Sequence, residues 1–384
     1  MNHFVSTSND NLPAKKELGL SVTPLIILGV LLAIGLRMLA ASMGQNYDMK
    51  SYRVVADIVC AGGNVYAETH RYNYGPVWFY IVGGLYTLFL KLFTSKMAFH
   101  YLVAMFLSLA DLGIFFILWK KFTIKTAFFF FLNPVSIIIT GYHSQFDNLA
   151  LLFGLWSVAI LDEPRGMHSF KQIAASLFLL GLSITTKHIL FLFPLWLAVK
   201  FRNSWQKLLA LFFPPLIFLI SFLPYWNIGH DGIIQNVFLY KSFNNAPLLN
   251  LFFPLPNDSI VPQCIFFAVL AAGTVLFRKE SPLHSLLIYT AMLVTFSSAI
   301  ANQYLAIVVP FIAVFPNLVL VAYTVGATWF LLADKMGLHI EAIQQYTPSY
   351  INYTLLIFLL FIGFSWHLIK VTFDMRNPCN PPQS

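Results

Sequence analysis

Residues 22–41, VTPLIILGVLLAIGLRMLAA, decide the fold class of this chain. A helix of this length, rising about 1.5 Å per residue, crosses the hydrocarbon core of a bilayer, and further apolar runs of about 15 to 22 residues follow along the sequence. Hydrophobic residues make up 58% of the chain and charged residues only 10%, which is more apolar surface than a soluble core can bury. The sequence therefore predicts a multi-pass membrane protein.

The spans are predicted to be helices rather than strands of a barrel. Residues 127–132 are apolar without the alternation of apolar and polar residues that barrel strands show. In lipid, a helix satisfies its backbone hydrogen-bonding groups within one segment. We therefore expect an all-α transmembrane protein of about 12 or 13 spans, with an exoplasmic loop that carries amphipathic helices at the membrane surface.

The chain is predicted to divide into a disordered cytoplasmic tail (1–21), a main transmembrane module (22–316), additional C-terminal transmembrane helices (317–370) and a second tail (371–384). Lys and Arg clusters between the apolar runs are typical of cytoplasmic loops, and they place loops 42–75 and 227–260 on the exoplasmic side. The cluster at 120–125 fits only if the run 76–93 does not fully cross, or if the charge rule fails there once. The parity of the spans therefore stays open.

Charge and cysteine content argue against two kinds of site. The net charge of +8 comes from residues in short turns between apolar runs, so no nucleic-acid partner is expected. Cys60, Cys264 and Cys379 lie far apart and form no CxxC pair. Neither a zinc site nor a redox site is therefore predicted.

Asp48, in the first exoplasmic loop, is the first candidate for chemistry. It precedes the segment 49–61, whose apolar residues fall on one helical face, as expected of a helix lying on the membrane surface. Asp48 could N-cap this helix, or it could act as a general base toward an acceptor hydroxyl. The two roles are compatible.

Two charged residues lie within apolar runs. Arg37 is about one turn from the end of the first run, where its guanidinium can reach the headgroups and either anchor the helix or clamp a phosphate. Asp111 lies in the middle of a span, so it must be protonated, paired or facing water. A hydrogen bond between packed helices is the favoured explanation.

A polar break between two later runs supplies three further candidates. It contains His143, Gln145 and Asp147. Asp147 is suited to cap the following helix, but the three side chains together are more polar than a turn needs.

Lys187 and His188 form a second polar break. The charge map places Lys187 outside, and this exception to the positive-inside rule favours a phosphate ligand over a solvated lysine. His188 could instead be neutral and structural. Gln303 lies in a third, uncharged break, and Lys241 lies in the loop 227–260, which is long enough to be either functional or disordered.

The order of these motifs resembles GT-C glycosyltransferases, multi-span enzymes that use polyprenyl-phosphate sugars, and above all their mannosyltransferase-like members. The resemblance rests on Arg37, Asp48 and the segments 63–66 (GNVY), 72–76 (YNYGP), 133–134 (NP) and 145–147 (QFD). Residues 143–148 (HSQFDN) are also similar to the His-Phe-Gln-Tyr-Asn element of the dolichyl-phosphate-glucose branch. The likeness covers most of residues 30–316.

The resemblance implies an inverting transfer of a hexose, with mannose favoured, from a polyprenyl-phosphate sugar to a hydroxyl of a glycan, lipid or protein. Asp48 would be the catalytic base. The implied donor-phosphate ligands are Arg37, Lys187 and His188. The expected substrate-binding residues are Tyr74, His143, Gln145, Asp147, Lys241 and Gln303. No metal or other cofactor is expected, because no second acid adjoins Asp147. A bacterial inner membrane is favoured over the endoplasmic reticulum.

Two other classes of function stay open at this stage. A transporter or lipid flippase also uses broken helices and buried polar residues, although no duplication of the two halves is evident in the sequence. A noncatalytic subunit of a glycosyltransferase is the second alternative. Only an enzyme would release free polyprenyl phosphate in a manner that depends on Asp48.

Overall fold

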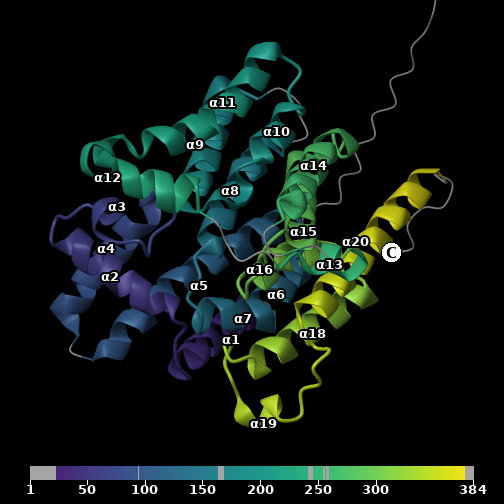
Figure 1. Cartoon of the computed structure of the whole chain (residues 1–384). Coiled ribbons are helices and arrows are strands. Elements are labelled where there is room, and N and C mark those ends of the chain that lie inside the picture. Colours follow the sequence, from purple (N-terminus) through teal and green to yellow (C-terminus); the bar gives the residue numbers. More distant parts are fainter. Residues whose placement is uncertain are drawn as a thin grey trace, which may run out of the picture.

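The computed structural model describes residues 23–93, 95–162, 168–240, 245–253, 256 and 259–376. Every regular element in these ranges is a helix, as predicted (Figure 1). The α-helices are α1 (Thr23–Ser42), α2 (Asp48–Cys60), α3 (Val65–Glu68), α4 (Pro76–Leu92), α5 (Lys96–Lys121), α6 (Ile124–Phe131), α7 (Pro134–Gly141), α8 (Asp147–Leu161), α9 (Phe170–Thr186), α10 (Phe193–Ala198), α11 (Ser204–Ile220), α12 (Trp226–Ile233), α13 (Pro247–Phe252), α14 (Val261–Leu276), α15 (Pro282–Thr295), α16 (Tyr304–Ile307), α17 (Val309–Val314), α18 (Leu318–Ala333), α19 (Glu341–Gln344) and α20 (Tyr353–Arg376). Shorter helical turns are η1 (His188–Leu190), η2 (Leu223–Tyr225) and the π-helical η3 (Ile234–Phe238). The predicted tail 1–21 lies outside the described residues, and α20 continues into the predicted tail 371–384 as far as Arg376.

Several of these helices can cross a bilayer. Four are long and apolar enough within the described ranges: Thr23–Ser42, Met97–Lys121, Ser204–Phe238 and Tyr353–Lys370. The bent pair α6 and α7 adds a fifth candidate, and seven shorter apolar helices of 10–17 residues accompany them. The structure thus has the multi-span character expected from composition, while the exact number of crossings stays a prediction.

A break at Asn133 and Pro134 separates α6 from α7 by a bend of 50°. Pro134 cannot donate a backbone hydrogen bond to the preceding turn. The Asn133 side chain accepts a hydrogen bond from the Val135 N–H at 3.0 Å, so it caps the new helix. This local chemistry starts α7 in a new direction and turns its polar side chains toward α5.

The helices form one connected bundle (Figure 1). Helices α8 and α9 pack together at its centre, with α5 against α8 and α11 against α9. Helices α2, α3, α4 and α12 gather on one side, and α18, α19 and α20 on the other. The loop before α2 and the loop between α7 and α8 therefore meet at the start of the central α8.

The segment 227–260 was predicted as an irregular loop, and that prediction was wrong for part of it. The chain stays helical from α11 through η2, α12 and η3 to Phe238, and α13 adds another helix. Glycines that suggested turns serve close packing instead: a Cβ on Gly232 would lie 1.8 Å from the Tyr66 carbonyl oxygen of α3. Lys241 lies outside the described residues.

Candidate functional site

Asp48 stands at the start of α2 and is half-buried. Its Oδ2 accepts a hydrogen bond from Gln145 Nε2. The N-cap residue of α2 is Tyr47, and the Asp48 backbone N–H donates to Asn46 Oδ1 at 3.4 Å. The start of the helix is therefore held by Asn46, and capping does not account for the Asp48 carboxylate. The amphipathic helix predicted at 49–61 is present as α2 and buries Met49, Tyr52, Val55 and Ala56.

The turn that presents Gln145 is fixed to the loop before α2. Asn46 contacts His143 Nδ1 through its side-chain nitrogen at 2.7 Å, and its backbone N–H donates to the Tyr142 carbonyl at 3.3 Å. Ser144 has a φ of 50°, a left-handed conformation that non-glycine residues seldom adopt. These contacts hold two polar segments together that lie about a hundred residues apart in sequence.

Lys187 and Asp147 form a second polar pair close by. Lys187 Nζ donates to Asp147 Oδ2 at 2.6 Å, and both side chains are buried. The Lys187 ammonium also lies 4.8 Å from the ring centre of Phe146 and 5.2 Å from that of Tyr74, distances at which cation–π attraction contributes. Three predicted site residues, Tyr74, Asp147 and Lys187, are therefore together.

Phe146 links the two polar pairs, because it lies between Gln145 and Asp147 in the chain. Its ring stacks on Trp78 of α4 with centroids 4.4 Å apart, and it meets Tyr74 edge-on at 4.9 Å. Phe146 and Trp78 are fully buried. Sequence reasoning missed both, because one aromatic residue carries no signal in a chain with 39 Phe and 8 Trp.

Gly75, the residue before α4, allows the start of this helix to lie close to the end of α9. Its φ of −72° suits any residue, so space rather than conformation requires glycine. A Cβ there would lie 2.2 Å from the Thr185 carbonyl oxygen. We expect Gly75→Ala to lower the free energy of unfolding by about 1–3 kcal/mol, measured by thermal unfolding in detergent.

Gly84→Ala on the same helix is the matched control for Gly75. A Cβ on Gly84 meets no atom within 4 Å, so we expect no loss of stability. Equal effects of the two substitutions would contradict the close approach of α4 to the end of α9.

His143 and His188 are neutral at pH 7. Burial lowers the pKa of each to about 4, and for His188 the neighbouring Lys187 lowers it further. His143 Nε2 and His188 Nδ1 are buried without a hydrogen-bond partner. The lowered pKa favours the neutral, structural alternative for His188 over a cation that binds phosphate near neutral pH.

The shifted histidine pKa values predict acid sensitivity. Between pH 6.5 and about 4 the unfolded chain binds protons that the folded chain does not, so the free energy of unfolding falls as the pH falls. For His143 the slope is at most about 1.4 kcal/mol per pH unit. We expect His143→Gln to flatten the pH dependence of thermal unfolding relative to wild type between pH 6.5 and 4.5. A difference that stays constant over this range would contradict the buried neutral state.

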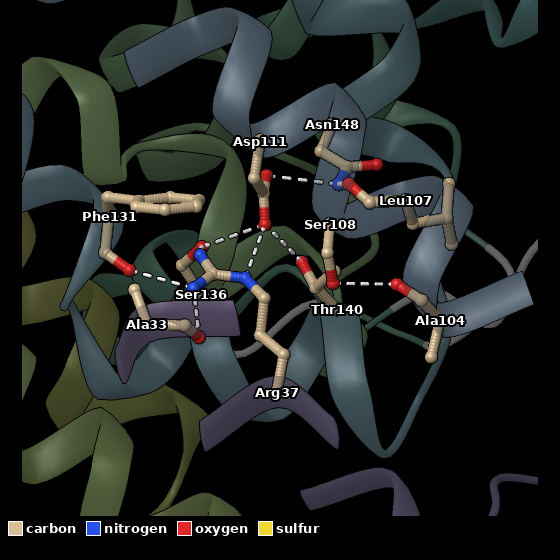
Figure 2. A network of polar contacts seen from close by, with 10 residues as sticks. All are labelled: Ala33, Arg37, Ala104, Leu107, Ser108, Asp111, Phe131, Ser136, Thr140 and Asn148. Atoms are coloured by element: carbon tan, nitrogen blue, oxygen red, sulfur yellow. Dashed lines mark hydrogen bonds and ion pairs between the residues drawn. The ribbon is translucent and has the colours of Figure 1, made fainter. Parts of the chain in front are cut away.

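Arg37 forms the centre of a third polar cluster, inside the helix bundle (Figure 2). Its Nε donates to Asp111 Oδ2 at 3.0 Å, and Nη2 donates to Ser136 Oγ at 2.9 Å. Nη1 donates to the carbonyls of Ala33 and Phe131 at 3.1 and 2.8 Å. The guanidinium is fully buried.

These contacts favour a structural role for Arg37 over binding of the donor phosphate, which stays a prediction. All three of its nitrogens already donate to protein oxygens, and the side chain extends into the bundle rather than to the headgroups. Asp111 accepts hydrogen bonds from Arg37, Ser136, Thr140 and Asn148 (Figure 2). Such a set of donors satisfies the oxygens of this buried carboxylate. Of the states open to Asp111 from sequence, the structure shows the paired one.

A small cavity separates the Asp111 cluster from the Lys187 pair. Its volume is about 20 Å³, enough for one water molecule. Its polar wall consists of Asp111, Ser136, Thr140, Gln145, Asp147 and Asn148. Asp147 Oδ1 and Asn148 Oδ1 are buried there without a hydrogen-bond partner.

The remaining predicted residue, Gln303, precedes α16 and is half-buried. Its neighbour Asn302 is tied to the C-terminal helices instead, because Tyr353 donates to it at 2.5 Å and it donates to Asp334 at 3.2 Å. Tyr304 lies within electrostatic range of Lys187 and Asp147. In the segment around Gln303, Tyr304 is thus the residue that lies near the Lys187–Asp147 pair. In the described part of the chain, no three His, Cys, Asp or Glu side chains are grouped to hold a metal ion.

No protein-family model matches this chain, and no curated protein matches its sequence. Its structure is similar to the crystal structure of ArnT from Cupriavidus metallidurans in the apo state, with a TM-score of 0.50 and 14% sequence identity over 91% of this chain and 77% of that chain. At this identity the likeness concerns the fold alone. It confirms the all-helical, multi-span membrane architecture that the sequence predicts.

Proposed function

We propose that this chain is a multi-pass membrane glycosyltransferase that moves a sugar from a lipid-linked donor to an acceptor hydroxyl, with Asp48 as general base. One observation carries the proposal: Asp48 caps no helix, yet it is half-buried and held by Gln145 beside the Lys187–Asp147 pair. A half-buried carboxylate that is oriented by an amide suits proton abstraction from a hydroxyl. The fold shared with ArnT is consistent with it.

In the proposed reaction, the acceptor hydroxyl oxygen forms a bond to the anomeric carbon of the donor sugar. The bond between that carbon and the phosphate oxygen breaks, and its electron pair leaves with the lipid phosphate. The hydroxyl proton passes to an Asp48 carboxylate oxygen. Direct attack of this kind inverts the anomeric centre, because nucleophile and leaving group lie on opposite sides of the carbon.

Gln145 is proposed to orient Asp48 rather than to bind substrate, since its amide donates to the carboxylate. Lys187 is proposed to stabilise the departing phosphate, which gains negative charge in the transition state. An ammonium has three N–H donors, so Lys187 can contact phosphate while Asp147 keeps one of them. Burial raises the pKa of Tyr74, and its protonated phenol is available to donate to the sugar.

The donor is proposed to be a polyprenyl-phosphate hexose, with mannose favoured and the transfer on the exoplasmic side of a bacterial inner membrane. The test supplies purified protein in lipid nanodiscs with polyprenyl-phosphate mannose, glucose or galactose. Release of free polyprenyl phosphate, with the sugar recovered on an acceptor or on water, supports the proposal. Movement of intact donor between leaflets without cleavage would identify a flippase instead.

A further inference from the structure

Two exposed cations lie over the ring of Tyr47, the residue before the proposed base. Lys50 Nζ is 5.3 Å and Arg71 Cζ is 5.2 Å from the ring centre of Tyr47, the residue that precedes Asp48. Arg71 Nη2 also donates to the Tyr47 hydroxyl at 2.7 Å. We call Lys50 and Arg71 the rim cations.

Neither rim cation is paired with a carboxylate. In the described part of the chain, no ion pair involves Lys50 or Arg71. Because each lies little more than 5 Å from the same ring centre, the two charges are at most about 10.5 Å apart. In water the repulsion between two exposed charges at such a separation is weak, and an anion bound between them would attract both.

The chain around Tyr47 brings these cations together from separate elements. Lys50 lies in the first turn of α2, where the helix dipole disfavours a cation. Arg71 comes from the connection before α4, which also carries Tyr74. The Arg71 hydrogen bond to Tyr47 thus joins two segments that each present a proposed site residue, Asp48 and Tyr74.

We infer that the rim cations bind a phosphoryl group of the acceptor. This inference rests on the proposed function, in which Asp48 touches the acceptor hydroxyl. In direct displacement the leaving phosphate departs on the side of the sugar opposite to that hydroxyl. Cations next to the base therefore lie on the acceptor side, whereas Lys187 is assigned to the donor phosphate. Arginine suits phosphate through paired hydrogen bonds, and lysine adds a point charge.

The proposal predicts saturable binding of a small phosphorylated probe. We would measure the binding of glycerol 3-phosphate to the full-length protein in a neutral detergent by titration calorimetry. Glycerol is the uncharged control ligand. We expect binding of glycerol 3-phosphate only, and at least a tenfold weaker affinity for Lys50→Gln/Arg71→Gln. Both positions are exposed, so an unchanged thermal unfolding curve is expected to verify the fold.

Lys91→Gln/Lys171→Gln is the control, because it removes the same charge from exposed positions at the end of α4 and the start of α9. Unchanged affinity in this control supports a local site. Equal losses in both double variants, or no saturable binding to wild type, would overturn the proposal.

Two further arms separate the possible sources of phosphate. The first arm tests the donor phosphate. If the rim cations held it, Lys50→Gln/Arg71→Gln would raise the KM for polyprenyl-phosphate sugar at least tenfold in the acceptor-free hydrolysis assay. That result would exclude the acceptor as their ligand.

The second arm tests the surrounding lipid. If lipid headgroups occupied the rim cations, glycerol 3-phosphate would bind at least tenfold more weakly in nanodiscs of phosphatidylglycerol than in nanodiscs of phosphatidylcholine. That result would also exclude the acceptor. Unchanged values in both arms support the acceptor. Failure to release any lipid phosphate would refute the proposed function, whereas calorimetry still decides whether the rim binds phosphate.

Discussion

Asp48→Asn is expected to lower the rate of polyprenyl-phosphate release by about 10²- to 10⁴-fold, the usual contribution of a general base. The amide has the shape of the carboxylate but cannot accept the acceptor proton. Because Asp48 is only half-buried and no helix depends on it for capping, the variant should keep the unfolding temperature of wild type. Donor binding should change little, so the loss is expected in kcat rather than in KM.

Asp57→Asn is the matched control for Asp48, since it removes an exposed acid from the same helix. We expect activity within about twofold of wild type for this control, well below the range assigned to a general base. Full activity of a folded Asp48→Asn protein would exclude Asp48 as the base and would favour a transporter or a noncatalytic subunit.

Asp111→Leu is expected to destabilise the fold by about 3–5 kcal/mol, because it leaves the Arg37 guanidinium buried without its partner. Arg37→Met/Asp111→Leu should recover most of this loss, since a buried pair can be replaced by apolar side chains at little cost. Thermal unfolding in detergent is expected to show the highest stability for wild type, a slightly lower one for the double variant and the lowest for the single variant. Lys120→Met, an exposed change at the end of α5, is the control.

The same double variant decides whether Arg37 has a second role. If Arg37 is structural, a folded Arg37→Met/Asp111→Leu protein should still release polyprenyl phosphate. A native unfolding temperature combined with a loss of activity of about a hundredfold or more would return Arg37 to the phosphate site, at the scale expected for a lost transition-state contact.

Sequence alone predicted the helical membrane fold because lipid leaves the backbone few alternatives. It predicted α2 because a surface helix has to segregate its apolar side chains. It did not predict the helical turns within the loop 227–260, where Gly229 and Gly232 pack against Asn64 and Tyr66. Local propensity cannot reveal such a long-range contact.

Polar residues at the breaks were predictable because unpaired polar groups are rare in so apolar a chain. Gln145, Asp147 and Lys187 were found in this way, and they lie in contact with Asp48 or with each other. The partner of Arg37 was not predicted, since Asp111 is 74 residues away. Because Arg37 lies near the end of its span, its guanidinium was expected to reach the headgroups. Inside the bundle it pairs instead with an opposite charge on a neighbouring helix.

The pairing of Arg37 with Asp111 also constrains how the protein is made. Inserted alone, each helix would expose a charge to lipid, at a cost of about 2.5–3.5 kcal/mol near the bilayer centre. Because α1 precedes α5 in the chain, Arg37 meets its partner only once α5 has entered the membrane. The donors from α7 and α8 follow in chain order, so the hydrogen bonds to Asp111 are completed last.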